Sequence, residues 1–126
     1  ELREAMHDMF WAIIHKQPLP AMALAKLAGY AQAAAGHMLL APVKHGFEWK
    51  FDTLLDFDSV LWPIARSAAD LLASDQLEYV RACSSKACEW FFLDTSKNHR
   101  RRWCDMTRCG NRAKMQRFYA RQKKQR

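Results

Sequence analysis

Several motifs that identify enzymes are missing from this chain of 126 residues. It has no glycine-rich phosphate loop, no Gly-x-Ser-x-Gly nucleophile motif and no His-Glu-x-x-His metal motif, which argues against the enzyme classes that these motifs mark. The histidines at positions 7, 15, 37 and 45 are scattered and lack the spacing of metal ligands. We therefore expect a protein that is not an enzyme.

Long apolar runs are also missing. Lys26, Gln32 and His37 interrupt the richest one, so no segment reaches the roughly eighteen apolar residues of a transmembrane helix. No segment has the pattern of a secretory signal. These features predict a cytoplasmic protein without a membrane partner.

Three acidic residues lie close together just before a predicted helix. One interpretation of Asp52, Asp56 and Asp58 is a hydrolase or cation site. Acidic side chains near a helix N-terminus are also favoured by the helix dipole, without any ligand. We prefer the second interpretation.

Cysteine is scarce, with four residues in the whole chain, all in its last third. They form two pairs of equal spacing, Cys83 with Cys88 and Cys104 with Cys109, separated by fifteen residues. Structural Zn²⁺ takes four ligands in a tetrahedron, and two short cysteine loops joined by a hairpin supply such a set. The spacing predicts one structural zinc ion held by these four cysteines.

Two alternatives to four cysteine ligands remain open. The pairs could be disulfides, which require an oxidising compartment. His99 could also replace one cysteine, although the equal spacing of the two pairs argues against this. The position of His99 beside three arginines indicates a polar surface instead.

Positive charge is concentrated towards the C-terminal end. Residues 81–126 carry 14 Lys or Arg and 3 acids, a net charge of +11, whereas residues 1–80 carry 6 basic and 10 acidic residues, a net charge of −4. Four thiolates around Zn²⁺ leave a formal charge of −2, which accounts for only part of this excess. The asymmetry predicts a polyanionic partner for the C-terminal part.

Three short motifs follow one another around the second cysteine pair: Asp-x-Ser-x-Asn at 94–98, Arg-Arg-Trp-Cys at 101–104 and Cys-Gly-Asn-Arg at 109–112. With them, residues 77–126 resemble the CGNR zinc finger family. Residues 1–76 resemble the C-terminal part of the ABATE domain that often precedes this zinc finger. The resemblance implies a bacterial, stress-linked transcription regulator that binds DNA, with two domains at 1–76 and 77–126. It also implies that an earlier N-terminal segment of the family is absent from this chain.

Within residues 77–126, the pattern predicts strands at 77–81 and 90–93, a returning strand at 100–103 and a helix at about 109–124. Such a module would be treble-clef-like, a hairpin followed by a helix. Met115, Phe118 and Tyr119 form an apolar edge at helical spacing, and basic residues occupy the opposite edge. The side chains expected to bind nucleic acid are Arg100, Arg101, Arg112, Lys114, Arg117, Arg121 and Lys124.

Other polar and aromatic residues of this module are expected to hold it together. Hydrogen bonds that involve the side chains of Asp94, Asn98 and Asn111 would fix the hairpin against the helix start. Trp90, Phe92 and Trp103 are expected in the small core, and stacking on unpaired bases is the alternative use of these rings.

Residues 1–76 are expected to be mainly helical, so the whole chain is of the mainly α class. Helical spacing predicts helices at 2–13, from Pro20 to about Gly36, and from Asp58 or Ser59 to 72, with a small hairpin between 37 and 51. Phe10, Trp11 and Trp62 are expected to expose apolar surface. The third helix is expected to have an apolar face, made of Val60, Leu61, Ile64, Ala68, Leu71 and Leu72.

Together with what the family resemblance implies, the zinc site and the charge pattern predict a zinc-containing transcription regulator that contacts duplex DNA through its basic C-terminal helix. The alternative is a zinc-stabilised module that binds a protein or a single-stranded nucleic acid. For the N-terminal domain, a small-molecule ligand and a homodimer partner are both open.

Overall fold

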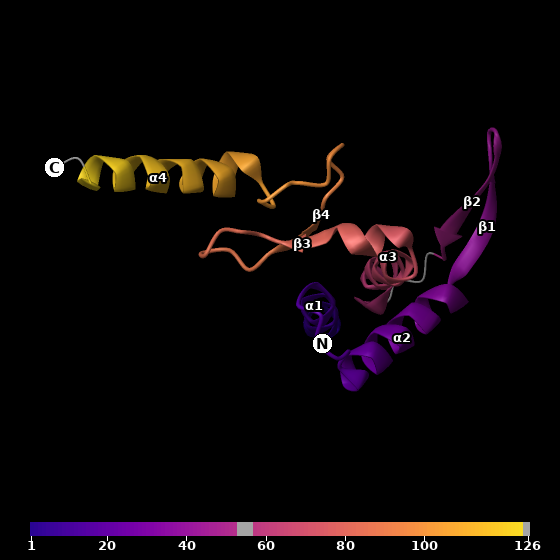
Figure 1. Ribbon diagram of the computed structural model, residues 1–126. Helices are drawn as coiled ribbons and strands as arrows, with labels where there is room; N and C mark the ends of the chain where they lie inside the picture. The colour runs from indigo at the N-terminus through magenta and orange to yellow at the C-terminus, as the bar shows by residue number, and fades with distance from the viewer. Residues whose placement is uncertain (53–56, 125–126) are drawn as a thin grey trace. The chain divides into compact units, whose positions relative to one another are not determined.

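The computed structural model describes residues 1–52 and 57–124 and divides them between two compact units, Glu1–Asp75 and Gln76–Arg126 (Figure 1). For residues 57 and 124 the structure describes the backbone but not the side chain. Asp56, one member of the predicted acidic cluster, is outside the described residues. Each unit is treated by itself below.

The N-terminal unit is built on three helices, α1 (Leu2–Ile14), α2 (Ala21–Gly36) and α3 (Trp62–Leu72). The first two agree with the prediction, because proline at positions 18 and 20 prevents α1 from continuing. Helix α2 packs against both α1 and α3. Alanine is the most frequent buried residue of these helices, with a few larger side chains such as Leu27 and Met9 beside it. The buried residues of the two core clusters are Leu2, Leu27, Ala65 and Ala68 in one, and Ala5, Met9 and Ala23 in the other.

The start and the buried face of α3 differ from the prediction. A 3₁₀ turn, η1 (Phe57–Val60), precedes the helix, and Pro63 lies in its first turn, where a proline needs no N–H partner. The buried face contains Trp62, Ala65 and Ala68, while Val60 and Ile64 are exposed. The tighter 3₁₀ turn does not continue the α-helical spacing, which displaces Val60 from the expected face.

Trp62 is buried, contrary to the expectation that it exposes apolar surface. Its ring stacks on His37 with 3.8 Å between the ring centroids and lies near Phe51 at 6.2 Å. His37 Nδ1 is 3.0 Å from Asp52 Oδ2. This group of side chains connects α3 to the two ends of the hairpin that precedes it.

That hairpin consists of β1 (Met38–Val43) and β2 (Gly46–Phe51), as predicted. The strands are antiparallel, in a register that runs from Met38 opposite Phe51 to Val43 opposite Gly46. Gly46 has a φ of +121°, a conformation that side chains other than glycine rarely adopt.

The C-terminal unit begins with a 3₁₀ turn, η2 (Asp75–Tyr79), and a short hairpin of β3 (Val80–Ala82) and β4 (Phe91–Leu93). Two predictions were therefore wrong: residues 77–79 are not a strand, and residues 100–103 do not pair with β4. The segment 100–103 bonds elsewhere. Arg101 N donates to the Asp94 carboxylate at 2.8 Å, and the Arg102 carbonyl accepts from Ser84 N at 2.8 Å.

A π-helical turn, η3 (Met106–Gly110), leads into α4 (Asn111–Lys124). The predicted apolar edge of α4 is present but exposed: Met115, Phe118 and Tyr119 keep 48%, 53% and 56% of their surface accessible. The described residues are thus mainly helical with two small hairpins, as the sequence predicts. None of the described helices has the length and apolar character that crossing a bilayer requires.

Candidate metal centre

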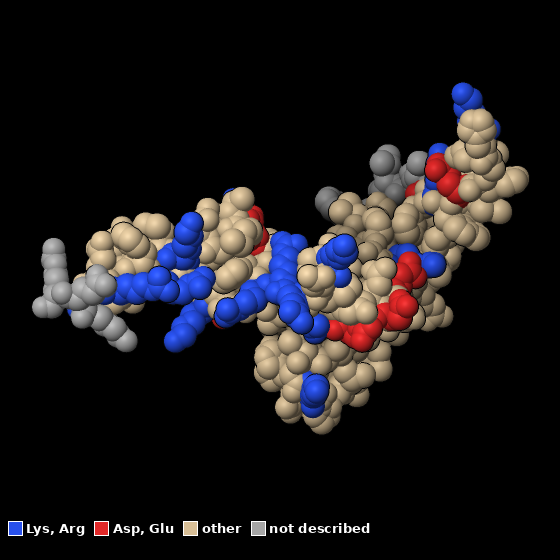
Figure 2. All heavy atoms as spheres, turned by 45° about the horizontal axis from the view of Figure 1, so that its top comes forward, with Lys and Arg blue, Asp and Glu red and all other residues tan. Residues whose placement is uncertain are grey.

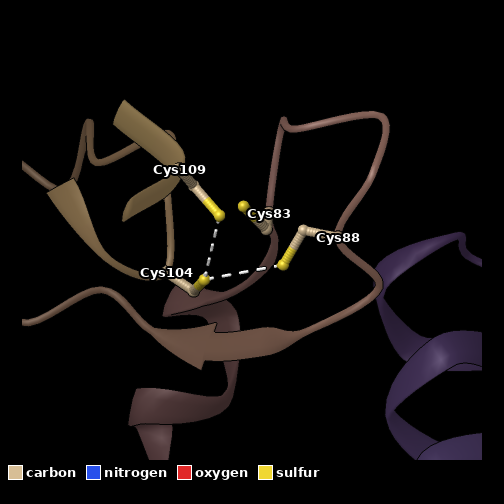
Figure 3. Close-up of side chains that lie close together, drawn as sticks. All are labelled: Cys83, Cys88, Cys104 and Cys109. Carbon is tan, nitrogen blue, oxygen red and sulfur yellow. Dashed lines mark hydrogen bonds between the residues drawn. The ribbon is translucent and has the colours of Figure 1, made fainter. Parts of the chain in front are cut away.

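Four cysteine sulfurs converge in the C-terminal unit (Figure 3). The Sγ atoms of Cys83, Cys88, Cys104 and Cys109 all lie within 4.8 Å of one another. Two of the separations are 3.7 Å, from Cys88 to Cys104, and 3.9 Å, from Cys104 to Cys109. A tetrahedron with Zn–S bonds of about 2.3 Å has edges of about 3.8 Å. The four sulfurs therefore fit one zinc ion, and all four cysteines are free thiols rather than disulfides.

Backbone hydrogen bonds bring the two cysteine loops together. Cys83 directly follows β3, and its N–H donates to the Trp90 carbonyl at 2.9 Å. Cys88 N donates to the Ser85 carbonyl at 2.9 Å, which closes the first loop as a tight turn. The bond from Ser84 N to the Arg102 carbonyl ties the first loop to the second. The sulfurs thus converge because main-chain bonds hold both loops.

The second loop is capped by Asp105, next to Cys104. Its Oδ1 accepts hydrogen bonds from Thr107 N at 2.7 Å, Thr107 Oγ1 at 2.7 Å and Arg108 N at 3.3 Å. The bonds from Thr107, first from its side chain and then from its backbone, lower the pKa of Asp105, with a smaller contribution from the Arg108 charge. The Asp105 carbonyl accepts from Cys109 N at 2.9 Å, so one residue fixes the loop that presents two of the cysteines.

The thiols differ in acidity when no metal ion is bound. Burial raises the pKa of Cys104 to about 12, and the neighbouring thiols add to the rise. Burial also acts to raise the pKa of Cys83, but N–H groups of Cys104 and Ser85 outweigh it and lower the pKa to about 7. The lowered pKa of Cys83 favours its thiolate, whereas burial raises the pKa of Cys104 and Cys109, so binding a cation would have to drive the deprotonation of those two thiols.

Comparison with protein families agrees with this geometry. Residues 79–122 match the family described as "CGNR zinc finger", and residues 1–75 match ABATE, described as "Putative stress-induced transcription regulator". The chain belongs to the ABATE family. Among curated proteins, no relative matches it. The zinc finger match and the close approach of four cysteines together support a single structural zinc ion.

The Cys-Gly-Asn-Arg motif of this ABATE protein occupies the junction between the metal centre and α4. Cys109 provides a sulfur, and Gly110 is buried where a Cβ would collide with the Met106 side chain. Asn111 Nδ2 donates to the Thr107 carbonyl at 3.0 Å, one turn back, so this bond lies within the junction of η3 and α4 and does not reach the hairpin that Asn111 was expected to hold. Arg112 is exposed at the start of α4. The motif therefore joins a ligand position to the helix that follows it.

Asp94 holds the turn between β4 and the second cysteine loop, rather than the hairpin against the helix start as predicted. It is 1% exposed. Its Oδ1 accepts from Ser96 N at 3.0 Å and Ser96 Oγ at 2.6 Å, and its Oδ2 accepts from Arg101 N at 2.8 Å. Burial opposes ionisation, but these hydrogen bonds prevail and lower the pKa of Asp94. Asn98, expected to act similarly, has an exposed side chain.

His99 lies apart from the cysteine cluster, so the structure does not favour it as a metal ligand. Its Nδ1 is 2.8 Å from the Asp94 carbonyl oxygen, and its ring stacks on Tyr79 with 3.8 Å between the centroids. The backbone φ of His99 is +47°, a left-handed conformation within the turn. These contacts make His99 part of the turn that Asp94 closes.

Two of the arginines expected to bind phosphate are engaged within the unit. The Arg101 guanidinium donates to the carbonyl of Trp103 at 2.8 Å and to that of Cys104, and lies 5.1 Å from the centre of the Phe92 ring. Arg117 Nε donates to the Ala113 carbonyl at 3.3 Å, and its guanidinium carbon lies 5.9 Å from the centre of the Trp103 ring. Both arginines thus stabilise the zinc finger itself.

The other basic residues surround the metal centre and line α4. Figure 2 shows Lys and Arg side chains gathered over the C-terminal unit. Arg100, Arg112, Lys114 and Arg121 are exposed, and the side chain of Lys124 lies outside the described residues. A hollow of 330 Å³ opens beside the cysteines, with Trp90, Arg108 and Arg112 on its walls.

Trp90 and Arg108 are absent from the predicted binding residues. Trp90 was expected in the core and is 74% exposed, because it lies outside the three-residue strand β4 and only its carbonyl is used, by Cys83 N. Phe92 and Trp103 are half-buried. The sequence offered no clear signal, because Trp90 begins the same apolar run, 90–93, that contains Phe92.

We expect one zinc ion per chain in the purified protein, and replacement of one sulfur by oxygen should destroy the site. Cys104→Ser is expected to weaken zinc binding by more than about a hundredfold, because a hard hydroxyl replaces a soft thiolate. Metal content by mass spectrometry and competition with a chromogenic chelator measure this. The matched control is His99→Ala, which should keep one zinc; equal losses in both variants would restore His99 as a ligand.

Asp94→Asn is expected to lower the melting temperature of the zinc-loaded finger by several degrees, because the amide offers one acceptor oxygen where the carboxylate offers two. The folded-state pKa of Asp94 is lowered, so its contribution should be full above the unfolded pKa of about 3.9 and decline only as pH falls through the folded pKa. The difference in melting temperature should therefore be constant from pH 8 to 5. Glu89→Gln, at an exposed position, is the control; an equal effect there would contradict the role of Asp94.

Proposed function

We propose that this ABATE protein regulates transcription by binding duplex DNA through its zinc finger. In this proposal residues 1–76 form a regulatory domain and residues 77–126 form a treble-clef-like zinc module. The bacterial cytoplasm, where thiols stay reduced, is the compartment that fits a four-thiolate zinc site. The protein is not an enzyme.

The observation that carries the proposal is the arrangement of charge in the C-terminal part. Residues 81–126 hold 14 Lys or Arg against three acids. Two of those acids, Asp94 and Asp105, accept hydrogen bonds from the turns around the cysteines. Only Glu89 remains exposed. Acidic groups therefore stabilise the fold while the cations face solvent, which is the electrostatic pattern of a nucleic-acid-binding module.

In the proposal, Cys83, Cys88, Cys104 and Cys109 hold the zinc ion. When bound, zinc supplies a structural cross-link between the two cysteine loops. Four thiolates fill a tetrahedral site and leave no position for a substrate, so the site has no catalytic role. Because Cys109 lies in η3, directly before α4, the cross-link also fixes the start of the basic helix.

The basic residues divide into two groups by their contacts. Arg101 and Arg117 contact carbonyls and aromatic rings of the finger, so we assign them to positioning the second cysteine loop and α4. Arg100, Arg112, Lys114 and Arg121 are exposed, and we assign them, together with Lys124, to phosphate contacts. Arg112 lies on the wall of the hollow beside the cysteines, and we assign it contact with a base edge as well.

A second candidate function follows from Trp90. This ring is 74% exposed on the wall of the same hollow as Arg108 and Arg112. An exposed indole beside guanidinium groups suits stacking on an unpaired base with a neighbouring phosphate held by charge. The second candidate is therefore a single-stranded nucleic-acid-binding module on the same scaffold.

Binding to duplex DNA is expected to fall linearly in log affinity with log salt. About six neutralised phosphates correspond to a loss of about a thousandfold between 50 and 200 mM salt. Arg112→Ala and Arg121→Ala should each reduce the slope by about one, because each removes one phosphate contact. Lys44→Ala, in the N-terminal unit, is the control and should leave the slope unchanged. Fluorescence anisotropy over a salt series measures these values, and absence of duplex binding at low salt would refute the proposal.

Trp90→Ala separates the two candidate functions. If duplex DNA is the partner, the variant should keep most of its affinity for duplex and show little preference for single strands. If unpaired bases are the partner, the variant should lose about tenfold or more on a single-stranded oligonucleotide, as expected for one stacked base. Phe92→Leu, a half-buried ring of the same module, controls for general loss of structure. Titration of both variants with matched single and double strands decides between them.

A further inference from the structure

Within the part of the chain that the structure describes, no third strand pairs with the hairpin of the N-terminal unit. Its sheet contains two strands, and Figure 1 shows the hairpin extending beyond the helices of its own unit. The register determines which backbone groups face outward. In an antiparallel hairpin, opposed residue pairs alternate between pairs that bond to each other and pairs whose N–H and C=O groups face outward. Asp52 N donates to the His37 carbonyl at 2.9 Å, so 37/52 is a bonded pair. Counting in steps of two along the register, the pairs 39/50, 41/48 and 43/46 are bonded as well. The N–H and C=O groups of Phe47, Trp49 and Phe51 therefore point away from β1.

The two outer edges of the hairpin are not equivalent. On β1, the outward-facing positions are Met38, Leu40 and Pro42. Pro42 has no N–H, so it removes a donor from that edge and blocks the approach of another strand. On β2, all three outward-facing residues have an N–H group. An added strand would therefore pair with β2 rather than with β1.

The sequence of β2 is complementary to itself in the antiparallel direction. Residues 47–51 read Phe-Glu-Trp-Lys-Phe, with an aromatic residue at the centre and at each end. The two residues beside the centre, Glu48 and Lys50, carry opposite charges. A two-fold axis at Trp49 places Glu48 opposite Lys50 of the partner subunit. It also places Phe47 opposite the partner's Phe51, and the two Trp49 residues form a hydrogen-bonded pair. The outward-facing groups at 47, 49 and 51 are the ones this register requires.

The side chains along this edge are accessible. Phe47 and Trp49 keep 70% and 63% of their surface exposed, and Leu40, on the same face as Trp49, keeps 56%. Glu48 and Lys50 form an ion pair with each other along the strand at 2.7 Å, with side chains 48% and 57% exposed. In an antiparallel pair, the same two charges meet the opposite charges of the neighbouring strand, so pairing leaves neither without a partner.

We propose that β2 is a homodimerisation edge, on which a second copy of this chain adds its own β2. The product is a four-stranded antiparallel sheet in the order β1-β2-β2-β1, with a closed two-fold interface. Two strands alone are marginal in water, and three or more with an apolar face are needed for independent stability. Pairing also places the exposed aromatic rings of the two copies beside each other across the new ladder. The proposed interface uses residues of the N-terminal unit alone.

Charge exchange on β2 tests this pairing in the zinc-loaded full chain. Lys50→Glu places acidic side chains opposite each other at both charged pairs, and Glu48→Lys places basic ones there. Each single substitution should weaken the dimer by about tenfold or more. The double variant E48K/K50E restores opposite charges and should recover the dimer. An equimolar mixture of the two single variants should form a heterodimer more readily than either forms a homodimer. Sedimentation equilibrium over a concentration series measures the dissociation constants.

Lys44→Glu, in the turn of the same hairpin, changes the net charge as Lys50→Glu does and should leave the dimer unchanged. Circular dichroism establishes that each variant is folded, and the double variant keeps the test decisive if a single variant is not. The proposal is overturned if the wild-type chain stays monomeric at all concentrations. It is also overturned if Lys50→Glu leaves the dissociation constant unchanged, or if E48K/K50E does not recover association.

Discussion

The C-terminal unit depends on the convergence of four cysteine sulfurs. Its described residues form little regular structure: a 3₁₀ turn, two three-residue strands, one π-helical turn and one exposed helix. About fifty residues of this kind bury too little apolar surface to be reliably stable. A structural zinc ion contributes on the order of 10 kcal/mol of apparent binding energy at neutral pH. The metal therefore replaces a hydrophobic core, which explains why Trp90, Met115 and Phe118 can remain exposed.

This dependence on a metal centre determines how charge is used around it. The buried Asp94 and the loop-capping Asp105 accept backbone N–H groups, because turns that present ligands leave many donors without a strand or helix partner. Arg101 supplies the matching donors for the carbonyls of Trp103 and Cys104. Arg102 and Arg117 both lie close to the Trp103 ring, which links the second loop to α4. These arginines are themselves exposed, so contacts within the finger, and not burial, distinguish them from the cations that are available to a polyanion.

Much of the N-terminal unit was predictable, and its errors have a local cause. The limits of α1 and α2 follow from prolines and helical spacing, and the hairpin follows from two β-rich runs around Gly46. The third helix was misplaced because a 3₁₀ turn and an α-helix have similar composition but different spacing. The burial of Trp62 was missed because its stacking partner, His37, lies 25 residues away in the sequence. Neither feature can be seen from neighbouring residues alone.

The sequence by itself determined the metal-ligating set expected here, the concentration of positive charge and the family to which the chain belongs. These properties depend on residue identity and spacing, which the covalent chain carries directly. Only the tertiary structure decided which arginines are free, that Trp90 faces solvent and that β2 has an open edge while Pro42 blocks β1. The physical reason is that each of these depends on which hydrogen-bond partner a group finds in space. Arg101 and Arg100 are neighbours with the same chemistry, and only the fold gives Arg101 two carbonyls to bind.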